Sequence, residues 1–351
     1  RFLPQDGWAV FARHDGARSV IDTRFFISHA TLSEKLRRVR EKAPWMLGDI
    51  GEGEEWLAFT FRSQEPMPLT PEDLSALLDR SDRTVKGAYG RMNLDARHRW
   101  ASASAHEVDV AVRELDLKAS ARVLDVGCGR GRHALLLAGR GYDVTGVDFV
   151  DGFIDAAKES ARENGVDRAR FVTGDARSVD LGAASFDAIV CLYDVIGTFP
   201  DQEDNQRVVD NLARHLKPGG RVLASVMNLE LTRLIARHHA DVANNPRALQ
   251  ELPPSVIMQQ SGDVYDPTYF LLDSTTGIVY RKEQFDGDGR PPGEYVIRDR
   301  RYSRDDIRAM CERAGLRLLW TRPVALREWD EAREVTDPKA KEILFLAERA
   351  G

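Results

Sequence analysis

The chain has few cysteines and lacks the residue spacing of a metal site. Only three of its 351 residues are cysteine (Cys128, Cys191 and Cys311), and each lies in an apolar or glycine-rich segment. Few cysteines without paired spacing argue against a disulfide framework and indicate a reducing compartment, so we expect a cytoplasmic protein. No Cys-x-x-Cys or Cys/His spacing indicates zinc, and we expect no metal.

The chain also lacks a long apolar run and an excess of positive charge. No stretch reaches the length of a membrane span and no signal peptide is visible, so we expect no membrane partner. The 50 Lys and Arg residues are outnumbered by 56 Asp and Glu residues, which gives a formal net charge of -6. An acidic balance provides no electrostatic footprint for nucleic acid, and we expect no nucleic-acid partner.

What the chain does contain is a short apolar strand that runs into three alternating glycines. Residues 122–126 have the composition of a buried parallel strand, and Gly127, Gly129 and Gly131 follow. Residues 133–138 then predict a helix. A strand, a glycine loop and a helix in this order open a nucleotide-binding βαβ unit. Glycine lets the backbone approach a ligand closely and adopt φ angles that other residues avoid.

Strand and helix patterns alternate through residues 121–226. The expected strands are 122–126, 141–148, 169–173, 186–192 and 221–226, and the expected helices are 132–140, 151–163 and 203–216. Repeated βα units with short loops predict an α/β domain whose parallel sheet is covered on both faces. Hydrophobic residues make up 42% of the chain, which is enough for one large domain and a smaller one.

Two segments precede this core. Residues 1–70 predict a small α+β unit of unknown role, because strand-like stretches lie on both sides of a helix-like one. Its expected strands are 7–12, 19–27 and 55–61, and its expected helix is 31–42. Residues 71–120 predict a helical lead-in to the core, and the last helix of this lead-in covers 105–117.

Two further segments follow the core. Residues 227–300 lose the alternation, and we interpret them as an inserted antiparallel β unit that serves as a substrate lid or as the contact of a homodimer. Its expected elements are a helical piece at 229–239 and strands at 255–260, 277–285 and 294–301. Residues 301–351 complete the core. A helix that starts at Ser303 precedes a final strand pair at 316–321 and 342–347.

The glycine loop is compatible with two classes of nucleotide ligand. The dinucleotide fingerprint Gly-x-Gly-x-x-Gly fits Gly127 and Gly129, and Asp148 lies at the distance of about 20 residues that the fingerprint expects for its acid. The third glycine of the fingerprint falls at position 132, where this chain has Arg132. An NAD(P)-binding protein therefore stays an alternative that the remaining motifs must decide.

Together with four later motifs, the glycine loop resembles the class I S-adenosylmethionine (SAM)-dependent methyltransferases of the small-molecule type. The five motifs are residues 123–131, the acid Asp148, Gly174-Asp175-Ala176, residues 186–190 running into Leu192-Tyr193-Asp194, and the signature 216–220. The resemblance covers 122–226, and more loosely 85–348, and it leaves 1–70 outside. It implies a Rossmann-like fold with a seven-stranded, mostly parallel sheet and SAM as cofactor, with S-adenosylhomocysteine (SAH) as product.

The resemblance assigns the methionine end of SAM to residues around the first motif. It implies that Gly127 and Gly129 let backbone amides approach the tail and the ribose, with Gly131 completing the loop. It places Asp125 near the methionine amino group. In the class, a helix before the first motif often closes over the cofactor, so we expect Tyr89 and Arg91 to reach the methionine carboxylate.

The ribose and adenine contacts follow from the later motifs. The resemblance implies that Asp148 accepts hydrogen bonds from both ribose hydroxyls, and charge-assisted bonds of this kind contribute on the order of 1.5–3 kcal/mol. It implies that Asp175 accepts the adenine amino group, with the Ala176 amide nearby, and that Phe149 and Leu192 flank the base. An alternative for Asp175 is a purely local role, because Gly-Asp is common turn chemistry.

The loop from Tyr193 to Phe199 resembles the loop of small-molecule N-methyltransferases. An amine acceptor must lose a proton before methylation and an alcohol needs a base, so we expect Tyr193 and Asp194 to be catalytic. A carboxylate at this loop would orient a cationic amine. The alternative is that Asp194 caps the turn and Tyr193 packs.

The sequence therefore predicts a SAM-dependent methyltransferase that acts on a small molecule, with an amine acceptor favoured over a hydroxyl. A carbon acceptor stays open. Because the cofactor motifs specify SAM and not the atom attacked, an enzyme of the same fold that uses SAM for cyclisation or alkyl transfer is the alternative. The identity of the acceptor and the oligomeric state are not predicted.

Overall fold

The computed structural model contains two compact units, Arg1–Pro68 and Leu69–Gly351. It describes residues 8–14, 19–21, 47–49, 55–61, 88–91, 103–245, 248–260, 263–285, 293–325 and 328–351. Within these residues, no helix has the length and apolar character needed to span a membrane. The expected helix at 31–42 and residues 71–87 and 92–102 of the expected lead-in lie outside the described part of the chain.

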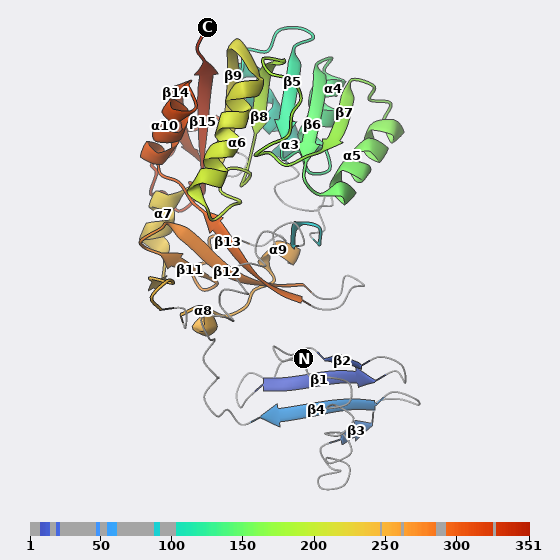
Figure 1. Cartoon of the computed structure of the whole chain (residues 1–351), viewed down its shortest axis with the longest axis vertical. Helices are drawn as coiled ribbons and strands as arrows, with labels where there is room; N and C mark the ends of the chain where they lie inside the picture. Colours follow the sequence, from blue (N-terminus) through green and yellow to red (C-terminus); the bar gives the residue numbers. More distant parts are fainter. Residues whose placement is uncertain are drawn as a thin grey trace. The chain divides into compact units, whose positions relative to one another are not determined.

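The first unit contains a four-stranded antiparallel sheet in the order β2-β1-β4-β3 (Figure 1). Strands β1 (Trp8–His14) and β4 (Glu55–Phe61) pair over their whole length, and they confirm the strands expected near 7–12 and 55–61. Strand β2 (Ser19–Ile21) pairs antiparallel with β1, and strand β3 (Leu47–Asp49) pairs antiparallel with β4. The aromatic and β-branched residues of the two central strands favour this extended conformation.

The second unit is built on a seven-stranded sheet in the order β14-β15-β9-β8-β5-β6-β7 (Figure 1). Its strands are β5 (Arg122–Val126), β6 (Asp143–Asp148), β7 (Ala169–Thr173), β8 (Phe186–Cys191), β9 (Leu216–Met227), β14 (Leu316–Val324) and β15 (Glu342–Arg349). The five neighbouring strands β9, β8, β5, β6 and β7 run parallel to one another. Strand β15 runs antiparallel to both β9 and β14. The seven-stranded, mostly parallel sheet expected from the sequence is confirmed.

Helices cover both faces of this sheet because successive strand residues point to opposite sides. Val123 packs on the face covered by α3 (Ser104–Glu114), α4 (Arg132–Gly139) and α5 (Asp151–Glu163). Its neighbour Leu124 packs on the other face with residues of α6 (Gln202–His215) and α10 (Arg304–Arg313).

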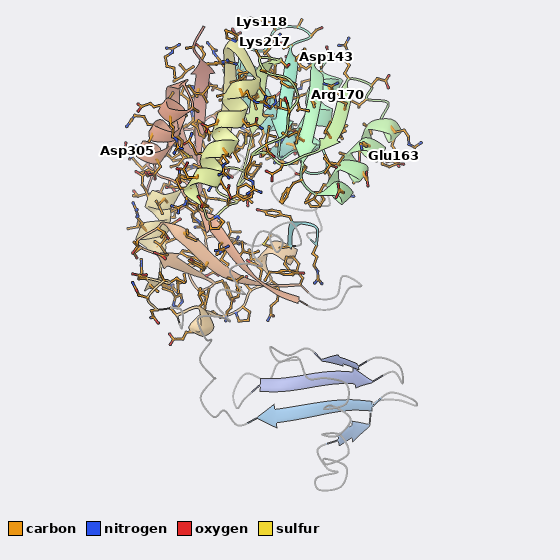
Figure 2. The ribbon with its side chains drawn as sticks, viewed as in Figure 1. Lys118, Asp143, Glu163, Arg170, Lys217 and Asp305 are labelled. Atoms are coloured by element: carbon orange, nitrogen blue, oxygen red, sulfur yellow. The ribbon has the colours of Figure 1, made fainter. Side chains whose placement is uncertain are left out.

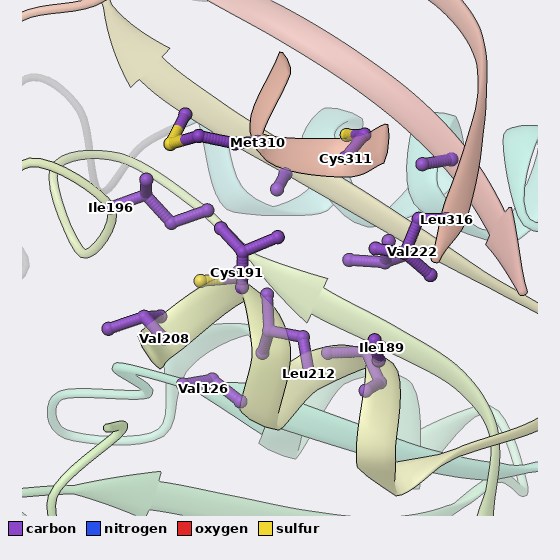
Figure 3. Close-up of a cluster of buried hydrophobic side chains, with 14 of the residues drawn as sticks. Val126, Ile189, Cys191, Ile196, Val208, Leu212, Val222, Met310, Cys311 and Leu316 are labelled. Carbon is purple, nitrogen blue, oxygen red and sulfur yellow. The ribbon is translucent and has the colours of Figure 1, made fainter. Parts of the chain in front are cut away.

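Figure 3 shows this second apolar layer, where Ile189 of β8 lies close to Leu212 of α6 and Cys311 of α10 completes the cluster. Charged side chains such as Lys118 and Lys217 lie at the edge of the sheet where the parallel strands begin (Figure 2). There Lys217 Nζ donates to Asp187 at 2.6 Å.

A second sheet lies beyond the opposite edge, where the parallel strands end (Figure 1). Its order is β10-β11-β12-β13, made of β10 (His238–Ala240), β11 (Phe270–Asp273), β12 (Ile278–Phe285) and β13 (Gly293–Arg300). Strands β11 to β13 are antiparallel, as the sequence predicts for the inserted unit, whereas β10 is parallel to β11. Three short helices in the described part of this unit accompany the sheet: α7 (Leu229–Ile235), α8 (Ala248–Glu251) and α9 (Ile257–Gln260).

The strand expected at 255–260 is wrong, because the chain forms the one-turn helix α9 there. Only Ser255 pairs like a strand residue, in an isolated bridge with Glu283. The carboxylate of Glu283 also accepts a hydrogen bond from the amide of Met258 at 3.2 Å. This acceptor satisfies an amide of the first helical turn that has no partner within the helix.

The core packing predicts a large stability difference between two leucine truncations. Leu212→Ala removes a side chain that is 2% exposed and should lower the free energy of unfolding by about 2–5 kcal/mol, because it leaves a cavity. Leu234→Ala, at a side chain that is 64% exposed, is the matched control and should change it by less than about 0.5 kcal/mol. Urea unfolding measures both, and equal effects would contradict the packing described.

Candidate cofactor and acceptor site

The predicted site residues gather at the edge of the large sheet where the parallel strands end. The glycine loop follows β5, Asp148 ends β6, Asp175 follows β7 and Tyr193 follows β8. Because these four strands are parallel neighbours, their carboxyl ends meet at one edge, which is where open α/β sheets bind ligands. The smaller sheet lies on this same side (Figure 1).

The glycine loop adopts a backbone conformation that favours glycine. Gly127, Gly129 and Gly131 have φ angles of 72°, 53° and 82°, in the left-handed region. A Cβ atom on Gly127 would lie 2.2 Å from Val195 Cγ2, and one on Gly131 would lie 2.8 Å from the Phe171 ring. The loop backbone is therefore packed tightly between the strands, with its peptide groups close to the edge of the sheet.

The carboxylate of Asp148 is held by two backbone amides. Asp148 is 7% exposed; its Oδ2 accepts from Gly129 N and its Oδ1 accepts from Val150 N, both at 2.9 Å. These two bonds fix the orientation of both carboxylate oxygens at the carboxyl end of β6. Two oriented oxygens at one position match the two adjacent hydroxyls of a ribose.

Asp125 presents a buried oxygen that nothing in the described part of the chain satisfies. Its side chain is 2% exposed, and its Oδ2 has no hydrogen-bond partner among these residues. Burial raises the pKa of Asp125 to about 7, and the charge of Asp148 adds to this, although the charge of Arg132 opposes it. A buried acceptor without a donor is unfavourable by about 1–3 kcal/mol. A bound ammonium group would satisfy it.

Asp175 organises the turn in which it lies. Arg177 donates to both of its oxygens, from Nη2 to Oδ2 at 2.7 Å and from Nε to Oδ1 at 3.1 Å. The Arg177 guanidinium also lies 4.0 Å from the centroid of the Phe199 ring. The neighbouring Ala176 carbonyl accepts from Asn211 at 3.0 Å. The adenine contacts expected of Asp175 and Ala176 stay predictions, and the local role of Asp175 is visible in the turn.

Tyr89 and Arg91 lie on a short helical turn that contacts both the core and the smaller sheet. The Tyr89 hydroxyl donates to Asp194, and its ring packs edge-on against Phe149 at a centroid distance of 6.2 Å. Arg91 donates to the Phe285 carbonyl of β12 at 3.3 Å. The structure thus brings Tyr89 to the junction of Phe149 and Asp194. The methionine-carboxylate role of Tyr89 and Arg91 stays a prediction.

The two residues expected to flank the adenine differ in exposure. Phe149 is half-buried beside Asp148, whereas Leu192 is 5% exposed and belongs to the apolar cluster under α3 and α4. Both follow directly on strand residues at the carboxyl edge. Their contacts with a base stay predictions.

Tyr193 is held in a strained backbone conformation by partners from three elements, β9, α3 and α4. Its φ angle is 68°, which is uncommon for a residue other than glycine. Its amide donates to Ser225 Oγ at 2.6 Å, and its hydroxyl donates to Glu107 of α3. The Arg132 guanidinium lies 4.7 Å from the centroid of its ring. These contacts fix the loop that carries Asp194.

Glu107 is the centre of this network, and the sequence reasoning missed it. It is 0% exposed and binds Arg132 Nη1 at 2.5 Å and His133 Nε2 at 2.6 Å. Burial opposes its ionisation, but the hydrogen bonds and charges of His133 and Arg132 outweigh burial and lower the pKa of Glu107 to about 2. Burial lowers the pKa of His133 to about 4. A periodic helix pattern does not reveal such an acid, because its partners are distant in sequence.

Asp194 lies between the short helical turn and the smaller sheet. Its side chain is half-buried and accepts the Tyr89 hydroxyl. Removal from water and the charge of Asp299 raise the pKa of Asp194, whereas the Tyr89 hydrogen bond and the Arg281 charge lower it. The outcome is a carboxyl that ionises less readily than an exposed aspartate.

The fold is a Rossmann-like α/β domain whose predicted site residues lie at its carboxyl edge. A model of the methyltransferase-domain family matches residues 123–220. The ubiquinone biosynthesis O-methyltransferase of Rickettsia conorii is 31% identical over 141 residues, which cover 40% of this chain and 46% of that protein. The uncharacterized methyltransferase YcgJ of Bacillus subtilis is 32% identical over 121 residues, 34% of this chain and 46% of that protein.

The chain thus spans about half the length of the curated relatives it matches. Among solved structures, a SAM-dependent methyltransferase from Clostridium acetobutylicum superimposes with a TM-score of 0.52 at 16% identity, covering 80% of this chain and 99% of that one. Such a likeness shows the fold. The predicted resemblance is confirmed: residues 123–220 match the model of the methyltransferase-domain family, and the surrounding fold is that of the class I SAM-dependent methyltransferases.

The buried network predicts that Glu107 stabilises the fold in a pH-dependent way. Because its pKa of about 2 lies below the ordinary value of 4.5, ionised Glu107 stabilises the fold above pH 4.5, and this contribution is lost as pH falls toward 2. Glu107→Gln should lower the free energy of unfolding at pH 7 by about 3 kcal/mol and flatten its decline below pH 4.5.

Urea unfolding at several pH values measures this change. Glu159→Gln, which removes one member of an exposed pair with Arg162, is the control and should have little effect. A Glu107→Gln protein as stable as the parent at pH 7 would show that the network does not hold the loop.

Proposed function

We propose that the protein binds SAM at the carboxyl edge of its large sheet and transfers the methyl group to a small-molecule acceptor, an amine in preference to a hydroxyl. The observation that carries this is the pair of buried carboxyls on adjacent strands. Asp148 presents two oriented oxygens, and Asp125 presents an oxygen without a donor among the described residues. A molecule with a ribose diol and an ammonium group complements both.

The chain's part in this chemistry is to bind and orient. SAM, when bound, supplies a methyl group that its sulfonium already activates. In our proposal Asp125 binds the ammonium group and Asp148 binds the ribose, while the left-handed glycine loop lets peptide groups lie against the ligand. Holding two reactants in line can account for much of the acceleration of such a transfer.

We place the acceptor beside Asp194. This carboxyl is half-buried and held by the Tyr89 hydroxyl on the loop that Tyr193 and Glu107 fix. A carboxylate there would bind the protonated amine and orient its nitrogen. In this proposal Tyr193 acts by positioning the loop, because its hydroxyl donates to Glu107.

Residues 227–300 are proposed as the lid over this acceptor. Arg91 contacts the Phe285 carbonyl of this unit, and the charges of Arg281 and Asp299 act on Asp194. The contact joins the unit to the helical turn that carries Tyr89, and the two charges act on the acceptor loop. A homodimer through this unit stays the alternative role.

A hydroxyl acceptor is the second candidate, because the relative from Rickettsia conorii is named an O-methyltransferase. The same site would serve an alcohol only if a base accepts the hydroxyl proton. A panel of amines and alcohols with matched carbon skeletons separates the two, since only the true acceptor class promotes formation of SAH from SAM.

The ribose role of Asp148 predicts a selective loss of cofactor affinity. Asp148→Asn removes the charge but keeps one acceptor oxygen, and it should weaken SAH binding on the order of 10- to 100-fold in titration calorimetry. Asp155→Asn, on the exposed face of the following helix, is the matched control and should bind SAH like the parent. Unchanged affinity in Asp148→Asn would remove the ribose assignment, and NAD binding without SAH binding would restore the dinucleotide alternative.

The acceptor role of Asp194 predicts the opposite pattern. Asp194→Asn should bind SAH within about twofold of the parent while kcat/KM for the best amine of the panel falls on the order of 10- to 100-fold, mainly through KM, because a charge-assisted contact to the acceptor is lost. Asp180→Asn, which is exposed, is the control. An Asp194→Asn enzyme with unchanged kcat/KM would leave Asp194 with a capping role alone.

A further inference from the structure

A further buried glutamate, Glu342, lies at the carboxyl edge of the large sheet and has no part in the proposed binding of SAM or of the acceptor. Glu342 is the first residue of β15, and because β15 is antiparallel to β9, its start lies beside the end of β9, where Glu342 pairs with Met227. It therefore lies at the same edge as Asp125 and Asp148. Three strand spacings of about 4.8 Å separate β15 from β5, so Glu342 and Asp125 lie on strands roughly 14 Å apart.

The Glu342 carboxyl is linked to the acceptor loop by one hydroxyl. It is 8% exposed and forms a hydrogen bond with Ser225, whose Oγ also accepts the Tyr193 amide at 2.6 Å. Its other oxygen, Oε2, has no hydrogen-bond partner within the described residues. The carboxyl thus reaches the base of the Tyr193–Asp194 loop with one oxygen unused.

Glu342 differs from Glu107 in its partners and in its pKa. Both glutamates are buried, but Glu107 binds Arg132, His133 and Tyr193, and its pKa is lowered to about 2. Glu342 forms no ion pair with the described residues, and burial, with the charges of Glu107 and Asp194, raises its pKa to about 7. A structural glutamate is expected to have its oxygens satisfied. An unsatisfied buried oxygen needs a further donor, and a bound ligand is one source of it.

We propose that Glu342 accepts the proton that the acceptor nitrogen loses, while Asp194 binds its cationic form. This rests on the proposed function. The N–H bond breaks and the proton moves to Glu342 Oε2. The freed nitrogen pair forms the new N–C bond as the S–C bond breaks with its electron pair passing to sulfur. Glu342 then returns the proton to solvent when the product leaves.

Groups from several elements set the titration of Glu342. The charges and polar groups that act on it or respond to it come from α3, from α4, from the loop after β8, from β9 and from the segment before β11. They are Glu107, Arg132, Tyr193, Asp194, Ser225 and Tyr265. The acids favour the protonated form and Arg132 and Ser225 favour the ionised form, so Glu342 changes charge near neutral pH.

The test uses Glu342→Gln in the full chain, with the panel of aliphatic amines and matched alcohols as acceptor probes. In the parent, kcat/KM should rise with pH through about 7 as Glu342 ionises. In Glu342→Gln this rise should disappear and kcat/KM should fall about 100-fold or more. SAH affinity by calorimetry should stay within about twofold, which shows that the cofactor half of the site is intact.

A thermal readout separates this role from a structural one. An acid whose pKa is raised on folding stabilises the fold most below pH 4.5, and stability falls as pH rises toward 7. Glu342→Gln removes that decline, so its Tm at pH 8 should exceed that of the parent by a few degrees. A glutamate kept for structure would give a lower Tm.

Glu348→Gln is the matched control, because it lies at the opposite end of β15 and pairs with Arg221 and Arg317. It should keep the parent's kcat/KM and pH profile. Parent-like turnover and pH profile in Glu342→Gln, or a lowered Tm at pH 8, would overturn the proton-acceptor role alone. A parent protein that binds no SAH, or forms none with any acceptor, would instead remove the proposed function itself.

Discussion

The structure depends on the contact between the glycine loop and the neighbouring strand β6. The Val147 carbonyl accepts from the amides of Gly127 and Cys128 at 2.8 and 2.9 Å, and the next residue, Asp148, accepts from Gly129. These bonds require left-handed backbone at the glycines, so sequence, loop shape and the position of the acid are coupled. Without this contact, neither the Asp148 carboxyl, which we propose binds the ribose, nor the glycine-loop backbone would have a defined position.

Four buried or half-buried acids lie around this contact, and they differ in role because their hydrogen-bond partners differ. Glu107 is surrounded by donors and stabilises the scaffold. Asp125 and Glu342 each keep an oxygen without a donor in the described structure, and Asp194 is held by one tyrosine. Residue type alone does not separate these roles. The donors around each carboxyl do separate them. In our proposal, the edge near β5 and β6 binds the cofactor, and the edge between β8 and β15 binds the acceptor.

Much of the core could be predicted because its signals are local. The apolar runs of β5 and β8 and the turn signals between them specify parallel strands, and the ordered motifs indicated the family. The helix α9 was missed because its amide acceptor, Glu283, lies 25 residues away in sequence. Glu107 was missed for the same reason, since its partner Tyr193 is 86 residues distant. In the sequence, Glu342 is an ordinary first residue of a strand. It lies at the carboxyl edge of the sheet because β15 runs antiparallel to β9.

The central claim is that this edge binds SAM and directs its methyl group to a small-molecule acceptor. Mass spectrometry of the products, after incubation of the full chain with SAM and the amine panel, tests it most directly. We expect SAH together with an amine that is heavier by one methylene unit. Methylthioadenosine in place of SAH, or unchanged SAM with every amine and alcohol tested, would contradict methyl transfer.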